Sequence, residues 1–441
     1  MLCAASTLRY RVDPDMRLYN TLTHDTDPLP PAPGPVRMYF CGPTVYRRIH
    51  VGNARPFVIS AWLRRWLLDN GYEVTLVQNI TDVNDKIYQA APGASAELAA
   101  QAAAWYIEDT DRLGLGRPDV EPRATETVGQ QIALIEELFG RGLAYQAEGD
   151  VYFRVGRFPE YGRLSGQRPD QVQEQEPAPR KEDPRDFALW KGHKPDEDTS
   201  WDSPWGPGRP GWHIECSAMA ETFLGPVFEI HGGGLDLIFP HHENELAQSR
   251  GAGREFAKIW MHNGMLEMSG ADMHKSLGND VSLHAALTAW GPETLLVFFM
   301  GAHWHSSIDF SDTALESARA QAARFRDAFG SPGVAAPEGE WEQLAAVLDD
   351  DFNTAEALAV LHRWRAACYL DLLRRALGIF GLGSLTRQQE APPEVMALAE
   401  RRLEARRRKD FEASDELRQE IDQAGWEVRD SAEGFRLVPR Q

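Results

Sequence analysis

The stretch 36–80 constrains the fold of this chain most strongly. An apolar run at 36–41 predicts a buried strand, and Gly42-Pro43-Thr44 follows it as a turn. Apolar residues then recur every three or four positions over 58–67, as on a helix, and 72–80 is a second apolar strand. This order makes a βαβ unit with a parallel sheet, and ligands of such sheets bind at the carboxyl ends of the strands.

The pattern changes twice after this unit. Residues 91–210 combine alanine-rich helical sequence, a short β-like piece at 150–155 and a Gln/Glu/Pro-rich loop, which indicates an insertion into the sheet domain. From residue 311 the periodicity is almost wholly helical, over 315–329, 340–348, 354–377 and 394–424, and 426–438 predicts a small hairpin. We therefore expect an α/β fold with a Rossmann-like parallel-sheet domain over 16–310 (insertion at about 91–210), an α-helical domain over 311–390 and a small mixed module over 391–441.

Composition indicates a globular protein whose charge argues against a general polyanion-binding surface. The 441 residues suffice for two or three domains, and the net charge is -20. A local basic run at 401–409 still permits phosphate binding, because binding depends on where charge lies; the alternative is a solvated helix face.

The chain offers no sign of export or membrane insertion. No apolar run approaches the roughly 18 residues of a membrane span, and the first residues lack a secretory pattern. The four cysteines are too scattered for a disulfide framework, which favours reduced thiols or metal ligands. We expect a cytoplasmic protein. Residues 1–15 read either as a flexible extension or as sequence upstream of a true start at Met16.

A set of Cys, His and Glu residues is the most explicit chemical signal. His241 and Glu245 are four apart, so on a helix they share one face. Together with Cys216 and with Cys41, at the end of the first strand, they offer donors suited to zinc. The alternative is that the cysteines are small buried hydrophobes and that the other two residues cap a helix.

Two further stretches suggest phosphate contacts. His50 and Asn53 open the first helix, where a helix amino terminus favours negative charge, and the Thr44 hydroxyl lies nearby in sequence. The stretch 273–279 carries Lys275 as a point charge. The alternatives are a helix cap with a surface histidine and a solvated turn.

Together these stretches resemble the cysteinyl-tRNA synthetase family, a branch of the class I aminoacyl-tRNA synthetases, from about residue 16 to the end. The match is carried by residues 39–46 (Tyr-Phe-Cys-Gly-Pro-Thr-Val-Tyr), 79–83, 186–191, 208–217, 231–245, 275–279 and 349–354. The resemblance implies an ATP-dependent ligase that forms cysteinyl-adenylate from L-cysteine and transfers cysteine to tRNA(Cys), with one Zn²⁺ per chain and ATP with Mg²⁺.

The resemblance also implies roles for individual residues. Zinc would be held by Cys41, Cys216, His241 and Glu245 and would take the substrate thiolate, which separates cysteine from serine without an editing site. Thr81 and Trp212 would hold the rest of the substrate. His50, Asn53 and Lys275 would stabilise charge on the phosphates. The implied ATP-binding residues are Thr44, Gly52, Gly232, Gly233, Gly234, Asp236, Lys275 and Ser276.

Three positions depart from the family pattern. Asn53 replaces a histidine and can donate a hydrogen bond but carries no charge, and Asn84 replaces an aspartate. Asp272 replaces the first lysine of Lys-Met-Ser-Lys-Ser, so an acid lies near the polyphosphate. We expect slower pyrophosphate-linked chemistry than in a relative with both lysines.

The tail resembles the family's tRNA-binding stem and anticodon modules, so the basic run is expected to meet tRNA phosphates. We expect a monomer without a membrane partner. One alternative is the related ligase that joins activated cysteine to an amino sugar in thiol biosynthesis. Another is a weakened paralogue that only binds nucleotide or tRNA, suggested by Asp272 and Asn53.

Overall fold

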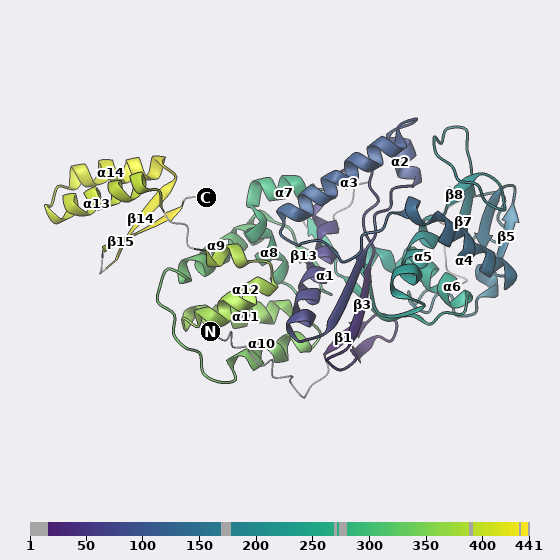
Figure 1. The fold of residues 1–441 in the computed structure, drawn as a ribbon, viewed down its shortest axis with the longest axis horizontal. Helices are drawn as coiled ribbons and strands as arrows, with labels where there is room; N and C mark the ends of the chain where they lie inside the picture. Colours follow the sequence, from purple (N-terminus) through teal and green to yellow (C-terminus); the bar gives the residue numbers. More distant parts are fainter. Residues whose placement is uncertain are drawn as a thin grey trace, which may run out of the picture.

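A four-stranded parallel sheet lies at the centre of the molecule (Figure 1). The computed structural model describes residues 16–168, 178–268, 271–272, 280–387, 391–431 and 434–439. The sheet order is β10 (Phe256–Asn263), β9 (Val227–Gly234), β3 (Pro35–Phe40), β4 (Glu73–Gln78), and all neighbours are parallel. The α/β fold and the βαβ unit predicted from 36–80 are confirmed. Because β4 and β9 lie on opposite sides of β3, the sheet has a switch point between β3 and β9, where ligands bind.

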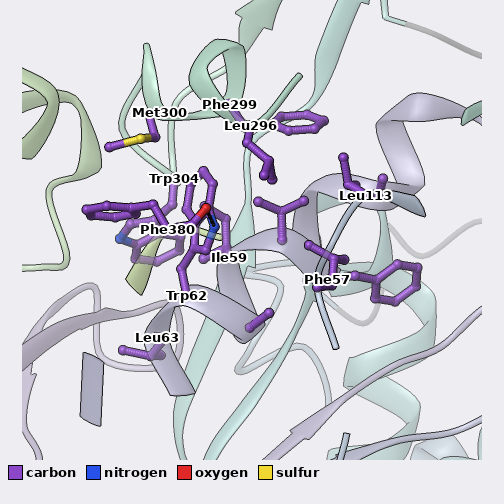
Figure 2. Packing of buried hydrophobic residues seen from close by; sticks show 14 of the residues in the cluster. Phe57, Ile59, Trp62, Leu63, Leu113, Leu296, Phe299, Met300, Trp304 and Phe380 are labelled. Carbon is purple, nitrogen blue, oxygen red and sulfur yellow. Dashed lines mark hydrogen bonds between the residues drawn. The ribbon is translucent and has the colours of Figure 1, made fainter. Parts of the chain in front are cut away.

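Helix α1 (Val51–Asp69) is buried around most of its circumference. Its Trp62 indole donates to the Phe380 carbonyl over 2.8 Å, and the two rings meet edge to face with centroids 5.3 Å apart. Figure 2 shows these rings among side chains of α8 (Pro292–Met300) and Trp304. The central sheet and the helical segment after residue 311 therefore share one hydrophobic core.

A second, antiparallel sheet has a core of its own at one end of the molecule (Figure 1). Its strands run in the order β5 (Ala144–Ala147), β6 (Asp150–Phe153), β7 (Phe187–Gly192), β8 (Gly208–Pro210), covered by α4 (Val128–Gly140). The β-like piece expected at 150–155 is confirmed as β6. Helix α3 (Ser95–Arg112), although inside the predicted insertion, packs in the first core with α1.

The remaining elements complete the central region. The two-stranded sheet β1 (Arg17–Asn20) and β2 (Asp25–Pro28) precedes β3, and a small sheet joins β11 (Leu266–Met268), β12 (Ala271–Asp272) and β13 (Ile308–Asp309). The helices of this region that were not given above are α2 (Asp85–Ala90), α5 (Trp212–Leu224), α6 (Glu243–Gly251) and α7 (Leu283–Trp290).

The tail is helical as expected, but two predicted helices are each broken in two. The stretch 354–377 forms α11 (Thr354–Ala366) and α12 (Leu370–Ile379), and 394–424 forms α13 (Pro393–Arg407) and α14 (Phe411–Gln423). At each break one residue is left-handed, Cys368 with φ 57° and Lys409 with φ 63°. Each break is a Schellman motif, closed after α13 by the Asp410 N–H on the Ala405 carbonyl. Glycine usually fills that position, so these breaks carry no glycine signal.

Two further helices, α9 (Asp312–Ala328) and α10 (Glu340–Asp349), complete the helical region. The last module stands at the far end of the molecule (Figure 1), where α13 and α14 pack on the hairpin β14 (Trp426–Ser431) and β15 (Gly434–Pro439) around a small separate core. The predicted hairpin is confirmed. Within the described residues, no helix is long and apolar enough to cross a membrane.

Candidate functional site

Four side chains from distant parts of the chain converge at the carboxyl end of β3. The donor atoms of Cys41, Cys216, His241 and Glu245 lie within 4.8 Å of one another, and all four residues are buried. Sγ of Cys41 is 3.8 Å from Sγ of Cys216 and 3.6 Å from Oε1 of Glu245, and Nε2 of His241 is 3.1 Å from that oxygen. Ligands around a tetrahedral zinc ion are separated by roughly 3.3 to 3.8 Å, so this donor set fits zinc.

The local fold explains why these residues meet. Cys41 directly follows β3, and its N–H donates to the Gly232 carbonyl of β9 over 3.1 Å. Cys216 lies in α5, a helix buried over most of its length, and Glu245 lies in the first turn of α6. Because β9 and α5 adjoin β3, and α6 packs on α5, residues far apart in sequence share one buried pocket.

A second overlapping set shares two of these donors. Cys41, His231, His242 and Glu245 also place their donor atoms within 4.8 Å of one another. Nε2 of His242 is 3.3 Å from Sγ of Cys41, and Nε2 of His231 is 2.8 Å from Oε2 of Glu245. The sequence interpretation assigned no role to either histidine. The neighbouring pair at 241–242 was a signal that either imidazole could face the cluster.

Burial sets the charge state of the cluster. Burial raises the pKa of the Cys41 and Cys216 thiols and raises the pKa of Glu245 to about 7. Burial also lowers the pKa of His241 to about 3, so its imidazole is neutral and has a lone pair to donate. Buried thiols and a buried carboxyl keep their protons until a bound cation compensates the negative charge that deprotonation leaves. This behaviour matches the chemistry of a metal site.

A cavity of about 490 Å³ opens beside this cluster. Among its lining residues are Cys41, Thr44, His50, Gly52, Asn53, Trp212, Gly234 and Asp236, which belong to the predicted site. The cavity therefore joins one candidate metal ligand to the amino terminus of α1, where the helix dipole favours an anion. Lys275 and Ser276 lie outside the described residues.

Other predicted site residues lie behind the cavity wall. Thr81 is buried, accepts from the Asn79 amide over 3.1 Å and donates to Glu215 over 3.0 Å, and it is not among the residues that line the cavity. Gly232 and Gly233 are also absent from the lining. A Cβ on Gly232 would overlap the Phe40 ring, and one on Gly233 would crowd Leu237 and His242. Their lack of side chains thus serves packing inside the sheet.

Trp212 connects the cavity to the cluster. Its ring stacks on His241 with centroids 4.1 Å apart and an interplanar angle of 26°. Nδ1 of His241 is in turn 2.9 Å from Nδ1 of His213, and burial lowers the pKa of His213 to about 3. These contacts fix the orientation of His241. No sequence pattern singled out His213.

The basic run is less available to phosphates than its sequence suggests. Arg402 is 3% exposed, and both of its terminal nitrogens bond the carboxylate of Asp430 at 2.8 and 3.1 Å. Arg406 reaches the same carboxylate over 2.6 Å. Arg402 therefore ties α13 to the hairpin, which corrects the expectation that the whole run meets tRNA phosphates.

Comparison with known proteins agrees with this architecture. The family described as tRNA synthetases class I (C) catalytic domain matches residues 29–320, and the DALR domain matches 344–367. The chain is 42% identical to the cysteine–tRNA ligase of Geobacillus thermodenitrificans, over 96% of this chain and 98% of that protein. It is also 42% identical to the cysteine–tRNA ligase of Nitrosomonas europaea, over 95% of this chain and 98% of that protein.

The fold is shared with more distant solved structures. A Mycobacterium tuberculosis methionyl-tRNA synthetase in complex with methionyl-adenylate aligns with a TM-score of 0.57 at 15% identity, covering 80% of this chain and 91% of that chain. LeuRS of Agrobacterium radiobacter K84 aligns with a TM-score of 0.55 at 10% identity, covering 81% and 86%. By its sequence match over nearly the whole length, the chain belongs to the cysteinyl-tRNA synthetase family of class I enzymes.

Proposed function

We propose that this protein activates L-cysteine with ATP as cysteinyl-adenylate and transfers the cysteinyl group to tRNA(Cys). The observation that carries the proposal is the buried Cys41, Cys216, His241 and Glu245 cluster, which opens through Cys41 and Trp212 onto a cavity of about 490 Å³. The family membership supports the same activity.

The cluster would hold one Zn²⁺. The first donor set suits zinc better than the second, because the first offers two sulfur atoms and the second offers one. When bound, zinc would hold the substrate as a thiolate, and a neutral serine hydroxyl is a poorer ligand. Trp212, stacked on His241, would cover the substrate beside the metal and exclude water.

The residues on the other side of the cavity would serve the phosphates. In the first step a carboxylate oxygen of cysteine attacks the α-phosphorus of ATP, and the bond to the β-phosphate oxygen breaks to release pyrophosphate. His50, Asn53 and the positive end of the α1 helix dipole would stabilise the charge on these oxygens, with Mg²⁺ and with Lys275. The residues that would position the nucleotide are Thr44, Gly52, Gly234, Asp236 and Ser276. Thr81 lies behind the cavity wall and would act on the substrate through Glu215, to which its hydroxyl donates.

Cysteine-dependent exchange of pyrophosphate into ATP, followed by charging of tRNA(Cys) in the same tube, tests the proposal. We expect exchange with cysteine, none above background with serine, and charging of the tRNA. Exchange without charging would instead support the ligase that joins cysteine to an amino sugar. Absence of exchange would support a protein that only binds.

A further inference from the structure

Two adjacent arginines line the cavity wall, and their partners differ. Arg47 and Arg48 lie between β3 and α1, and the cavity lining carries three cationic side chains, these two and Lys86, against one carboxylate, Asp236, among the described residues. In a chain of net charge -20, this wall gathers cationic side chains, although Glu108, Asp109 and Asp280 pair with the two arginines. Positive charge that faces an open cavity attracts an anionic ligand.

Arg48 forms ion pairs with two carboxylates of helix α3. Its Nη1 bonds Asp109 over 2.7 Å, its Nη2 bonds Glu108 over 2.8 Å, and its guanidinium lies over the Trp105 ring at 5.4 Å. Asp109 is fully buried and also contacts Nδ1 of His284 over 3.0 Å. Both terminal nitrogens of Arg48 thus serve to join α3 to the segment before α1.

Within the part of the chain that the structure describes, Arg47 makes one ion pair. Its Nη1 is 2.6 Å from Oδ2 of Asp280, and its side chain is 33% exposed. Its guanidinium lies 5.7 Å from the centre of the Tyr46 ring, and Nζ of Lys86 lies 5.9 Å from the same centre. Two cations gathered around one ring repel each other, and an anion between them would relieve that repulsion.

Backbone contacts hold the carboxylate of Asp280 close to this wall. The Val51 N–H donates to the Val281 carbonyl and the Leu283 N–H donates to the Ile49 carbonyl, each over 2.8 Å. The segment that follows Asp280 is thereby fixed beside the start of α1. Arg47 is thus held at the cavity through Nη1, and among the described residues its other terminal nitrogen makes no ion pair, so it can form a bidentate contact.

We propose that Arg47 binds the triphosphate of ATP and exchanges its ion pair with Asp280 for that contact, whereas Arg48 is a structural residue. The inference rests on the proposed function, since it assumes that ATP occupies this cavity. It makes Arg47 a binding residue of the nucleotide site and makes Asp280 a competitor for its guanidinium.

Opposite effects of two substitutions test this exchange. The dissociation constant of Mg·ATP is measured by calorimetry without cysteine. Arg47→Gln is expected to weaken binding roughly 10- to 100-fold, since a charged hydrogen bond to phosphate is lost, and Arg47→Lys is expected to weaken it less. Asp280→Asn is expected to tighten binding about two- to fivefold, because the competing carboxylate is gone. The double variant should match Arg47→Gln alone.

A structural ion pair would behave differently, because removing either partner would then change binding in the same direction. Equal losses for Arg47→Gln and Asp280→Asn, or an unchanged constant for Arg47→Gln, would overturn the proposal. Arg141→Gln is the matched control. Arg141 pairs with Glu137 over 3.0 Å, directly follows α4 beside the antiparallel sheet, and does not line the cavity.

The exchange assay separates this inference from the proposed function. If Mg·ATP binds in an Arg47-dependent way but no cysteine-dependent exchange occurs, the inference holds and the proposed activity fails. If exchange proceeds normally and Arg47→Gln leaves the ATP constant unchanged, the proposed activity holds and the inference fails.

Discussion

At the scale of single residues, Cys216 and Cys368 provide a matched pair of thiols. Cys216 is buried in the cluster, whereas Cys368 is a partly buried residue at the break between α11 and α12. We predict that Cys216→Ser lowers bound zinc, measured by mass spectrometry of the purified protein, from about one per chain to below about a tenth, because a metal ligand is lost. Cysteine-dependent exchange should fall by at least about 100-fold.

Cys368→Ser is the control and should keep both the metal and the exchange activity. Retained zinc in Cys216→Ser would argue that the second donor set, Cys41 with His231, His242 and Glu245, holds the ion.

Asp351 is a residue whose ionisation opposes folding. Burial raises its pKa from 3.8 to about 6, although the Tyr19 N–H donates to its carboxylate over 2.7 Å. Because the pKa of Asp351 is higher in the folded protein than in the unfolded one, the folded protein binds more protons than the unfolded protein between about pH 4 and pH 6. Stability contributed by the protonated form is therefore present below about pH 4, falls as pH rises to about 6, and is lost above that.

We predict that Asp351→Asn stabilises the protein by up to about 3 kcal/mol at pH 7.5 and by little at pH 3.5. Asparagine tolerates the left-handed backbone of this position, where φ is 57°. Denaturant unfolding at both pH values measures the difference. Asp350→Asn, at an exposed neighbour, should change stability by less than about 0.5 kcal/mol. A gain of equal size at both pH values would contradict the role of ionisation.

At the scale of elements, the Schellman motif after α13 places a non-glycine residue in a strained left-handed conformation, and a glycine there would remove that strain. Lys409 occupies the left-handed position with φ 63°, and its N–H donates to the Arg406 carbonyl over 3.0 Å. We predict that Lys409→Gly raises the unfolding free energy of the carboxy-terminal module by about 1 kcal/mol, since glycine has no Cβ to clash there. Native-state hydrogen exchange of the amides of α13 and α14 would report it.

Lys409→Ala separates backbone strain from the loss of the lysine charge. Alanine also carries a Cβ, so it should give no gain. Equal stabilisation by both variants would assign the effect to charge repulsion within the basic run.

At the scale of the whole molecule, arginines of β14 and β15 join the carboxy-terminal module to α9. Arg429 pairs with Asp327 of α9 over 2.7 Å, and Arg436 bonds the carbonyl of the same residue over 2.9 Å. Arg401 and Arg407 of this module are exposed and make no ion pair within the described part of the chain. They are the arginines of the basic run best able to meet phosphates.

We predict that the double variant Arg401→Gln/Arg407→Gln weakens tRNA(Cys) binding roughly 10-fold at low salt and lowers the slope of log affinity against log salt by about 2, because two phosphate contacts are lost. Filter binding at several salt concentrations measures both. Arg141→Gln/Arg163→Gln, two exposed arginines of the second sheet's unit, is the control. An unchanged salt slope would leave the basic run as a solvated helix face.

The sequence by itself determined the parts of the fold that are local. The βαβ unit, the carboxy-terminal hairpin and the helical tail follow from periodicities that neighbouring residues impose on one another. The family resemblance adds the four candidate ligands, because the order and spacing of the motifs are read from the chain alone. The helix ends at Cys368 and Lys409 were not predicted, because the left-handed residue at each end is not glycine.

Only the tertiary structure decided which distant groups face one another. Burial of Thr81 behind the cavity wall, the second donor set with His231 and His242, and the sequestering of Arg402 by Asp430 all join residues from separate elements. Likewise, two adjacent arginines that look alike in sequence differ because α3 offers Arg48 two carboxylates and Arg47 meets one. Local pattern does not encode these pairings, because they depend on how the sheet and helices pack.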